Sequence, residues 1–286
     1  MSQVRFLTLS DGWAFGPQLW ATHDGGHTWT RIPTRGLRVT ALETRGQQVF
    51  AVWARCSGTG ADFASHCTGF TVYSSLAGSD SWTPAATMAA APAGSGASLL
   101  LTGTIAYWLA PAGNLFAGPL TGAGLQPVQQ ATGAPSEQTG PPCAAGPAQA
   151  DGQPSRALLA AGVDGLDLVC AGPSAGGRQN KTIYASSDGG QTWQRTGQAP
   201  AAGTAFFLSA SPSGTLVLAT SLGIEVSADG GASWSAASGA VPPGGFVYAG
   251  MTTDAQGVAV PADPSQHAVW FTYDGGSTWQ RSPVSA

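Results

Sequence analysis

The chain has 286 residues, of which 43% are apolar and only 9% are charged, with a formal net charge of −4. It contains a single lysine, so a basic face for nucleic acid or an anionic membrane is excluded. No run of about 18 apolar residues predicts a membrane span. Glycine (41) and proline (20) are abundant without a collagen-like period, which indicates many short elements joined by tight turns.

One phrase, [Ser/Thr]-x-Asp-Gly-Gly-x-[Ser/Thr]-Trp, occurs four times and a degraded copy covers residues 74–82. Asp-Gly between extended runs indicates a hairpin turn, whose amides and hydroxyls the carboxylate can bind. The tryptophan is suited to packing between sheets. We therefore expect structural roles for the aspartates and tryptophans of the four copies: Asp24, Trp29, Asp188, Trp193, Asp229, Trp234, Asp274 and Trp279.

This phrase resembles the Asp-box, or BNR, repeat, which is found in neuraminidases and in non-enzymatic propellers. The resemblance implies an all-β propeller with four-stranded antiparallel blades, in which each box joins the third and fourth strands on the side opposite an active site. We expect one domain over residues 1–286, with a long Pro/Gly-rich loop at 129–155. Six blades are expected, and seven are the alternative if that loop contains strands. The six predicted blades cover residues 1–33, 37–86, 97–130, 155–197, 203–237 and 244–284.

Four cysteines lie in loop-rich segments with spacings of eleven and twenty-seven residues. These spacings favour the disulfides Cys56–Cys67 and Cys143–Cys170 and an oxidising compartment. Free thiols and a zinc site using Cys56, His66 and Cys67 are the alternatives, and we predict no metal because adjacent ligands bind one ion poorly. The first five residues lack the features of a signal peptide, so an extracytoplasmic location requires a leader outside this numbering.

Sialidase chemistry needs an arginine clamp, a Tyr nucleophile activated by Glu, and an acid/base. The resemblance to neuraminidases points to Arg5, Arg156, Tyr248 and Glu225 as the residues for such a role. The chain departs from that family because a third inner-strand arginine is missing, and Arg31-Ile32-Pro33 follows the first box instead of preceding it. Glu43 is expected in a turn or loop.

The segment Phe6–Gly16 that leads into the first box is also similar to repeats of Ycf48-like photosystem II assembly factors. That family typically has seven blades and binds partners through basic patches, whereas the ten arginines here are scattered along the sequence. This second resemblance implies a fold and names no partner.

Ligands of propellers usually occupy loops away from the boxes, and loops carry function more often than strands. Three long polar loops, 55–69, 172–181 and 261–267, are expected at that mouth. Their candidate binding residues are Arg55, Asp62, His66, Arg178, Asn180, Lys181, Asp263 and His267.

The leading hypothesis is a non-catalytic extracytoplasmic propeller, without a cofactor, that acts as a monomer and binds a protein or glycan through this mouth. A sialidase-type glycoside hydrolase is the alternative from another class, and an assembly-factor or scaffold domain is a third.

Overall fold

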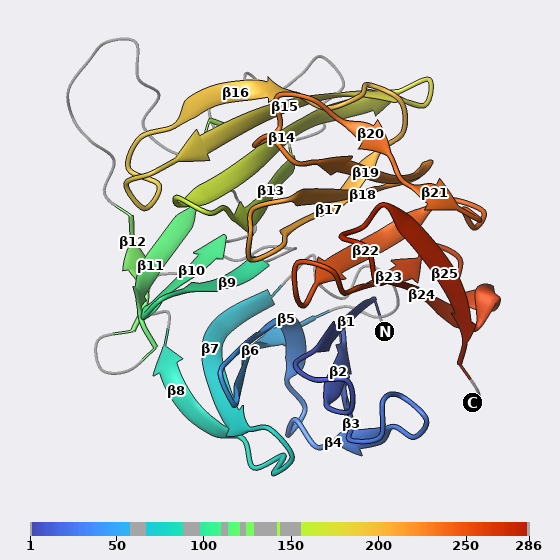
Figure 1. The fold of residues 1–286 in the computed structure, drawn as a ribbon. Helices are drawn as coiled ribbons and strands as arrows, with labels where there is room; N and C mark the ends of the chain where they lie inside the picture. The colour runs from blue at the N-terminus through green and yellow to red at the C-terminus, as the bar shows by residue number, and fades with distance from the viewer. Residues whose placement is uncertain are drawn as a thin grey trace. The chain divides into compact units, whose positions relative to one another are not determined.

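The computed structural model describes residues 2–57, 67–87, 98–109, 114–120, 124–128, 142–143 and 156–284. The chain forms two compact units, residues 1–128 and 129–286. Each unit contains three sheets, and in each sheet four consecutive strands pair antiparallel with their neighbours in sequence (Figure 1). The all-β class and the six-bladed propeller fold are therefore confirmed, whereas single-domain organisation stays a prediction.

The first unit contains the blades that the sequence predicts at 1–33, 37–86 and 97–130. Blade 3 lacks a box but keeps four strands. The strands are β1 (Gln3–Phe6), β2 (Gly12–Phe15), β3 (Leu19–Thr22), β4 (Thr30–Ile32), β5 (Arg38–Arg45), β6 (Gln48–Cys56), β7 (Cys67–Leu76), β8 (Thr83–Thr87), β9 (Ser98–Thr102), β10 (Ile105–Leu109), β11 (Leu115–Pro119) and β12 (Gln126–Pro127).

The second unit contains blades 4, 5 and 6. Their strands are β13 (Arg156–Ala161), β14 (Leu166–Ala175), β15 (Arg178–Ser186), β16 (Gln194–Gln198), β17 (Ala205–Ala210), β18 (Leu216–Thr220), β19 (Gly223–Ser227), β20 (Ser235–Ala236), β22 (Phe246–Met251), β23 (Gly257–Pro261), β24 (Ala268–Thr272) and β25 (Thr278–Pro283). A two-residue strand, β21 (Ser238–Gly239), adds to blade 6 by pairing in parallel with β25. A short 3₁₀ helix, η2, covers Pro264–Gln266.

Apolar side chains fill the spaces between adjacent blades within each unit. Trp108 is fully buried against Phe70 of the preceding blade, with ring centroids 4.8 Å apart. Phe207 of blade 5 packs against Tyr248 of blade 6, with ring centroids 4.5 Å apart. Alternate residues of each strand supply these contacts, since a strand directs successive side chains to opposite faces.

The four intact boxes share one hydrogen-bond network. In each box the aspartate Oδ1 accepts a hydroxyl from the residue two positions before it, at 2.8–2.9 Å. The residue four positions after it donates its backbone amide to Oδ1 and its hydroxyl to Oδ2. The tryptophan Nε1 donates to the carbonyl of the second glycine at 2.9–3.1 Å.

These hydrogen bonds keep the box carboxylates ionised. The bond from the Ser233 hydroxyl is the main cause that lowers the pKa of Asp229 to about 2, and the Thr28 and Thr278 hydroxyls lower the pKa of Asp24 and Asp274 in the same way. Both oxygens of each aspartate are occupied and neither carries a proton near neutral pH. Through these hydrogen bonds each box aspartate holds the backbone of its own turn.

Replacing Asp188 with alanine is expected to lower the free energy of unfolding by about 1–2 kcal/mol, since four donors lose their acceptor in a turn that water reaches. Urea unfolding followed by circular dichroism measures the change. The matched control is Asp164→Ala, which removes an exposed acid from another turn of blade 4. Equal stability of the two variants would contradict the structural role of the box.

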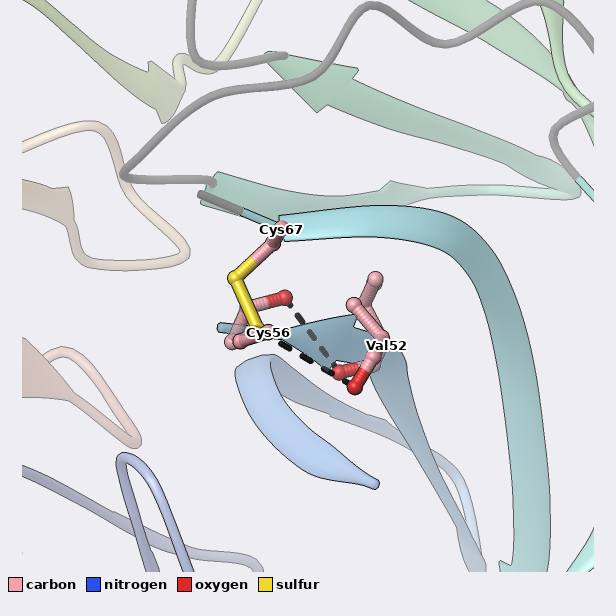
Figure 2. The surroundings of a disulfide bond; sticks show 5 residues. Val52, Cys56 and Cys67 are labelled. Carbon is pink, nitrogen blue, oxygen red and sulfur yellow. Dashed lines mark hydrogen bonds between the residues drawn. A yellow bond between two sulfur atoms is a disulfide. The ribbon is translucent and has the colours of Figure 1, made fainter. Parts of the chain in front are cut away.

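The structure contains the two predicted disulfides, and the described cysteines include no free thiol. Cys56 and Cys67 are register partners at the end of β6 and the start of β7 (Figure 2). Cys143 is buried and is bonded to Cys170 of β14. The described residues include no helix long and apolar enough to cross a membrane.

Candidate functional site

The connection between blades 1 and 2 carries three arginines around one cavity. Strand β3 runs into the first Asp-box and β4 runs back from it, so residues 33–37 lie at the end of these strands away from the box. This is the end at which propeller ligands were expected.

A tight turn sets the geometry of the connection. The Leu37 amide donates to the Thr34 carbonyl at 3.0 Å, and the Thr34 hydroxyl donates to the Leu37 carbonyl at 2.7 Å. Arg35 and Gly36 occupy the left-handed region, with φ of 53° and 82°. Because a non-glycine residue is strained there, the turn must be held by its surroundings, and such strain concentrates at functional sites.

The cavity has a volume of about 410 Å³ and is lined by Gln18 together with residues 31 and 33–38. Its charged lining consists of Arg31, Arg35 and Arg38, without an acidic residue. These arginines form no ion pair with the described residues. Guanidinium groups remain charged at all physiological pH values and pair with carboxylates or phosphates through two parallel hydrogen bonds. The cavity is thus suited to an anionic group.

The predicted loop at 172–181 is wrong. β14 continues to Ala175 and β15 begins at Arg178, so this segment is a hairpin closed by Gly176 and Gly177. Their φ values of 57° and 72° suit a two-residue hairpin turn, which only glycine adopts readily. Arg178 and Asn180 are therefore strand residues, and Asn180 Oδ1 accepts a hydrogen bond from Gln198.

Lys181 is a buried strand residue. Its Nζ donates to the carbonyls of Pro200 and Ala202 at 2.6 and 2.8 Å, and burial lowers the pKa of its ammonium group. In this position the side chain ties β15 to the segment that leads into blade 5.

Acetic anhydride is expected to leave Lys181 unmodified in the folded protein and to acetylate it fully after unfolding in urea, because folding shields the nitrogen from the reagent. Mass spectrometry of tryptic peptides measures both yields. Rapid acetylation in the folded state would contradict the buried placement.

The remaining mouth candidates are spread along the chain. Asp263 caps helix η2 by accepting hydrogen bonds from the Ser265 amide and the Gln266 side chain, while His267 ends that helix in a left-handed conformation. Arg55 lies on β6, opposite Thr68 of β7. Asp62 and His66 lie outside the described residues.

The residues selected by analogy with sialidases have other contacts. Arg5 on β1 forms a 2.6 Å ion pair with Glu43, which lies on strand β5 rather than in the expected turn. In the second unit, Arg156 begins β13, and the buried ring of Tyr248 on β22 packs against Phe207 at 4.5 Å. Glu225 on β19 interacts electrostatically with Lys181, and burial raises its pKa.

The three-arginine cavity was not predicted, because Arg31-Ile32-Pro33 was compared only with the sialidase motif. Three of the ten arginines fall within residues 31–38, so a cluster was visible in the sequence. The turn at Thr34–Leu37 converts that cluster into the lining of one cavity. The expectation that the ten arginines are scattered is therefore wrong for Arg31, Arg35 and Arg38, which line one cavity.

Comparisons with known proteins agree with this fold. The BNR/Asp-box repeat family model matches residues 184–195, and no curated protein matches the sequence. The structure titled "YCF48 bound to D1 peptide" is 16% identical, with a TM-score of 0.53, over 98% of this chain and 80% of that chain. YCF48 from Cyanidioschyzon merolae is 13% identical, with a TM-score of 0.55, over 99% and 84% of the two chains. At this identity the likeness shows the fold alone.

Proposed function

We propose that this BNR-repeat β-propeller, which has a Ycf48-like fold, is a non-catalytic extracytoplasmic binding protein. It holds an acidic segment of a protein partner against Arg31, Arg35 and Arg38. The observation that carries the proposal is the cavity lined by these three arginines, which form no ion pair with the described residues.

The charge distribution supports an anionic partner. The chain has only eleven lysines and arginines and an overall charge of −4, yet three of the eleven line one cavity without a neighbouring acid in that lining. Collecting like charges costs free energy, and an anion that binds all three removes this repulsion. The affinity should fall with salt because the arginines are partly exposed.

A protein segment is favoured as the source of the anion. One protein of similar fold is described as bound to a peptide, and extended segments fit the loops at the ends of propeller strands. The backbone amides and Gln18 can orient a peptide, while the arginines select its carboxylates.

The extracytoplasmic location is supported by the two disulfides. Disulfides persist in oxidising compartments and are rare in the cytosol. All four cysteines of the chain form these two disulfides, so no cysteine thiol is left for metal binding or nucleophilic chemistry.

Sialidase activity has less support. It requires arginines that are free to clamp a substrate carboxylate, whereas Arg5 is already paired with Glu43. It also requires an accessible Tyr nucleophile, and only 3% of Tyr248 is exposed.

Titration calorimetry with a synthetic hexapeptide of alternating glutamate and alanine tests the proposal. We expect Arg31→Gln/Arg38→Gln to weaken binding at least tenfold, since each charge-assisted hydrogen bond contributes about 1.5–3 kcal/mol. Arg195→Gln, on β16 outside the cavity, is the matched control and should change the affinity less than twofold. Sialyllactose serves as the glycan probe.

Equal affinity of the double variant and the wild type would contradict the site. Equal affinity for a peptide with glutamine in place of glutamate would contradict recognition of acidic groups. Tighter binding of sialyllactose than of the peptide would replace the protein partner with a glycan.

A further inference from the structure

A second cavity lies between blades 4 and 5, at the end of their strands that carries the Asp-boxes. Its volume is about 350 Å³. The turn between β13 and β14 forms one wall, and the β17–β18 turn and the blade 5 box form the other. The lining comprises residues 162–167, 185–187, 196, 213–214 and 228–230.

Asp167 occupies a position that the other box-containing blades give to apolar residues. Ser186, the first residue of the blade 4 box, is paired with Leu166 of β14. Asp167 is the next residue of β14 and is paired with Ala185. The same register in blades 1, 5 and 6 places Trp13, Val217 and Val258 at this position. All three are at least 98% buried. A carboxylate therefore replaces an apolar contact in blade 4 alone among these four blades.

The Asp167 side chain is buried and has no partner among the residues that the structure describes. Only 7% of the residue is exposed, and its carboxylate has no hydrogen bond or ion pair with any described residue. Desolvation raises its pKa to about 6. A methyl group added at Gly162 would lie 2.3 Å from Oδ2, so this glycine leaves room for the carboxylate. A buried charge without a partner is costly, and its retention indicates a ligand.

The charge of the lining selects a cation. The lining contains Asp164, Asp167 and Asp229 and no lysine, arginine or histidine. Asp254 also lies near, because it accepts the Ser213 amide at 2.6 Å. Asp229 uses both oxygens within its box, so Asp167 supplies the free acceptor while the other acids contribute negative potential.

The shape of the lining favours an organic ammonium group. Calcium needs six to eight oxygen ligands, and the described residues contain no group of three His, Cys, Asp or Glu side chains that fits a metal. Val163, Leu166 and Ala228 provide apolar walls for methylene groups. Oδ2 lies against Gly162, which hinders the two parallel hydrogen bonds that a guanidinium prefers.

We infer that the cavity between blades 4 and 5 is a binding site for an alkylammonium group, with Asp167 as its counter-ion and the apolar lining around its methylenes. The ammonium belongs either to a lysine side chain of a polypeptide or to a free amine. The inference is independent of the arginine cavity and of the partner proposed for it.

Nuclear magnetic resonance titration with two probes, acetyl-Gly-Lys-Gly-amide and n-pentylammonium, tests the site. Shifts are expected for the amides of residues 162–167 and 213–214. Asp167→Asn should weaken binding at least tenfold, whereas Arg195→Gln should leave it unchanged. Because the carboxylate must be ionised, binding at pH 5 should be about tenfold weaker than at pH 8.

Tenfold tighter binding of the peptide than of pentylammonium would assign the site to a lysine side chain, and equal binding would assign it to a free amine. Absence of shifts at 10 mM of both probes at pH 8 would overturn the site. So would equal binding of both probes by Asp167→Asn, provided that its circular dichroism spectrum matches the wild type.

Discussion

Asp167→Val is expected to stabilise the protein by about 2–3 kcal/mol at pH 8, because it removes a buried carboxylate. Near pH 3, where this carboxyl group is protonated, the same substitution should remove no buried charge and this stabilisation should be absent. The estimate follows from the rise of the Asp167 pKa from 3.8 to about 6, because one pKa unit corresponds to about 1.4 kcal/mol. Valine is the residue at the equivalent position of blades 5 and 6.

The direction with pH follows from the raised pKa in the folded state. Below about pH 4 the carboxyl group is protonated whether the chain is folded or unfolded, so burial of charge costs nothing. Between about pH 4 and 6 the unfolded chain loses its proton first, and the wild type loses stability as the pH rises. The full cost of burying the carboxylate is present above about pH 6.

Urea unfolding of wild type and Asp167→Val at pH 4, 6 and 8 measures this difference. Asp164→Val is the control, because that residue is exposed in the turn that leads into β14. A stability difference between wild type and Asp167→Val that did not grow with pH would show that the carboxylate has a stabilising partner.

Removal of the Cys143–Cys170 disulfide is the second large effect. Loss of this bond in the double variant Cys143→Ala/Cys170→Ala is expected to lower the free energy of unfolding by about 3.5 kcal/mol. A cross-link spanning 27 residues removes that much chain entropy from the unfolded state, in the loop-closure model. The Cys56–Cys67 bond spans only 11 residues, so its loss should cost slightly less.

Unfolding in the presence and absence of reductant provides the control. Reductant should lower the stability of the wild type by more than that of Cys143→Ala/Cys170→Ala or Cys56→Ala/Cys67→Ala, because each variant retains one disulfide. Equal stability of Cys143→Ala/Cys170→Ala and oxidised wild type would contradict the contribution of this bond. Mass spectrometry of each protein confirms which bond is present.

Local chemistry made the blades predictable from sequence. Asp188 and Trp193 form hydrogen bonds within one turn, so the spacing of the motif indicates the structure that it forms. Strand β21 was not predicted, because two residues pairing in parallel with β25 leave no periodic pattern. The hairpin at Gly176-Gly177 was mistaken for a loop because the strand residues that flank the turn, such as Ser174, Arg178 and Gln179, are polar.

The sites depended on contacts that spacing does not reveal. Lys181 was expected in a polar loop, but the carbonyls that receive its hydrogen bonds come from residues 200 and 202. Asp167 looked like an ordinary strand residue until the register aligned it with Trp13 and Val217. The arginines at 31–38 are close in sequence, yet only the turn at Thr34–Leu37 shows that they share a cavity.

Photocrosslinking tests the proposed binding role most directly. The acidic hexapeptide would carry a benzoylphenylalanine at one end, and mass spectrometry would locate the residues it labels. The arginine cavity predicts labels at Gln18 and within residues 31–38 that disappear in Arg31→Gln/Arg38→Gln. Labels on the Asp-box turns, or labels that persist in the double variant, would contradict the account.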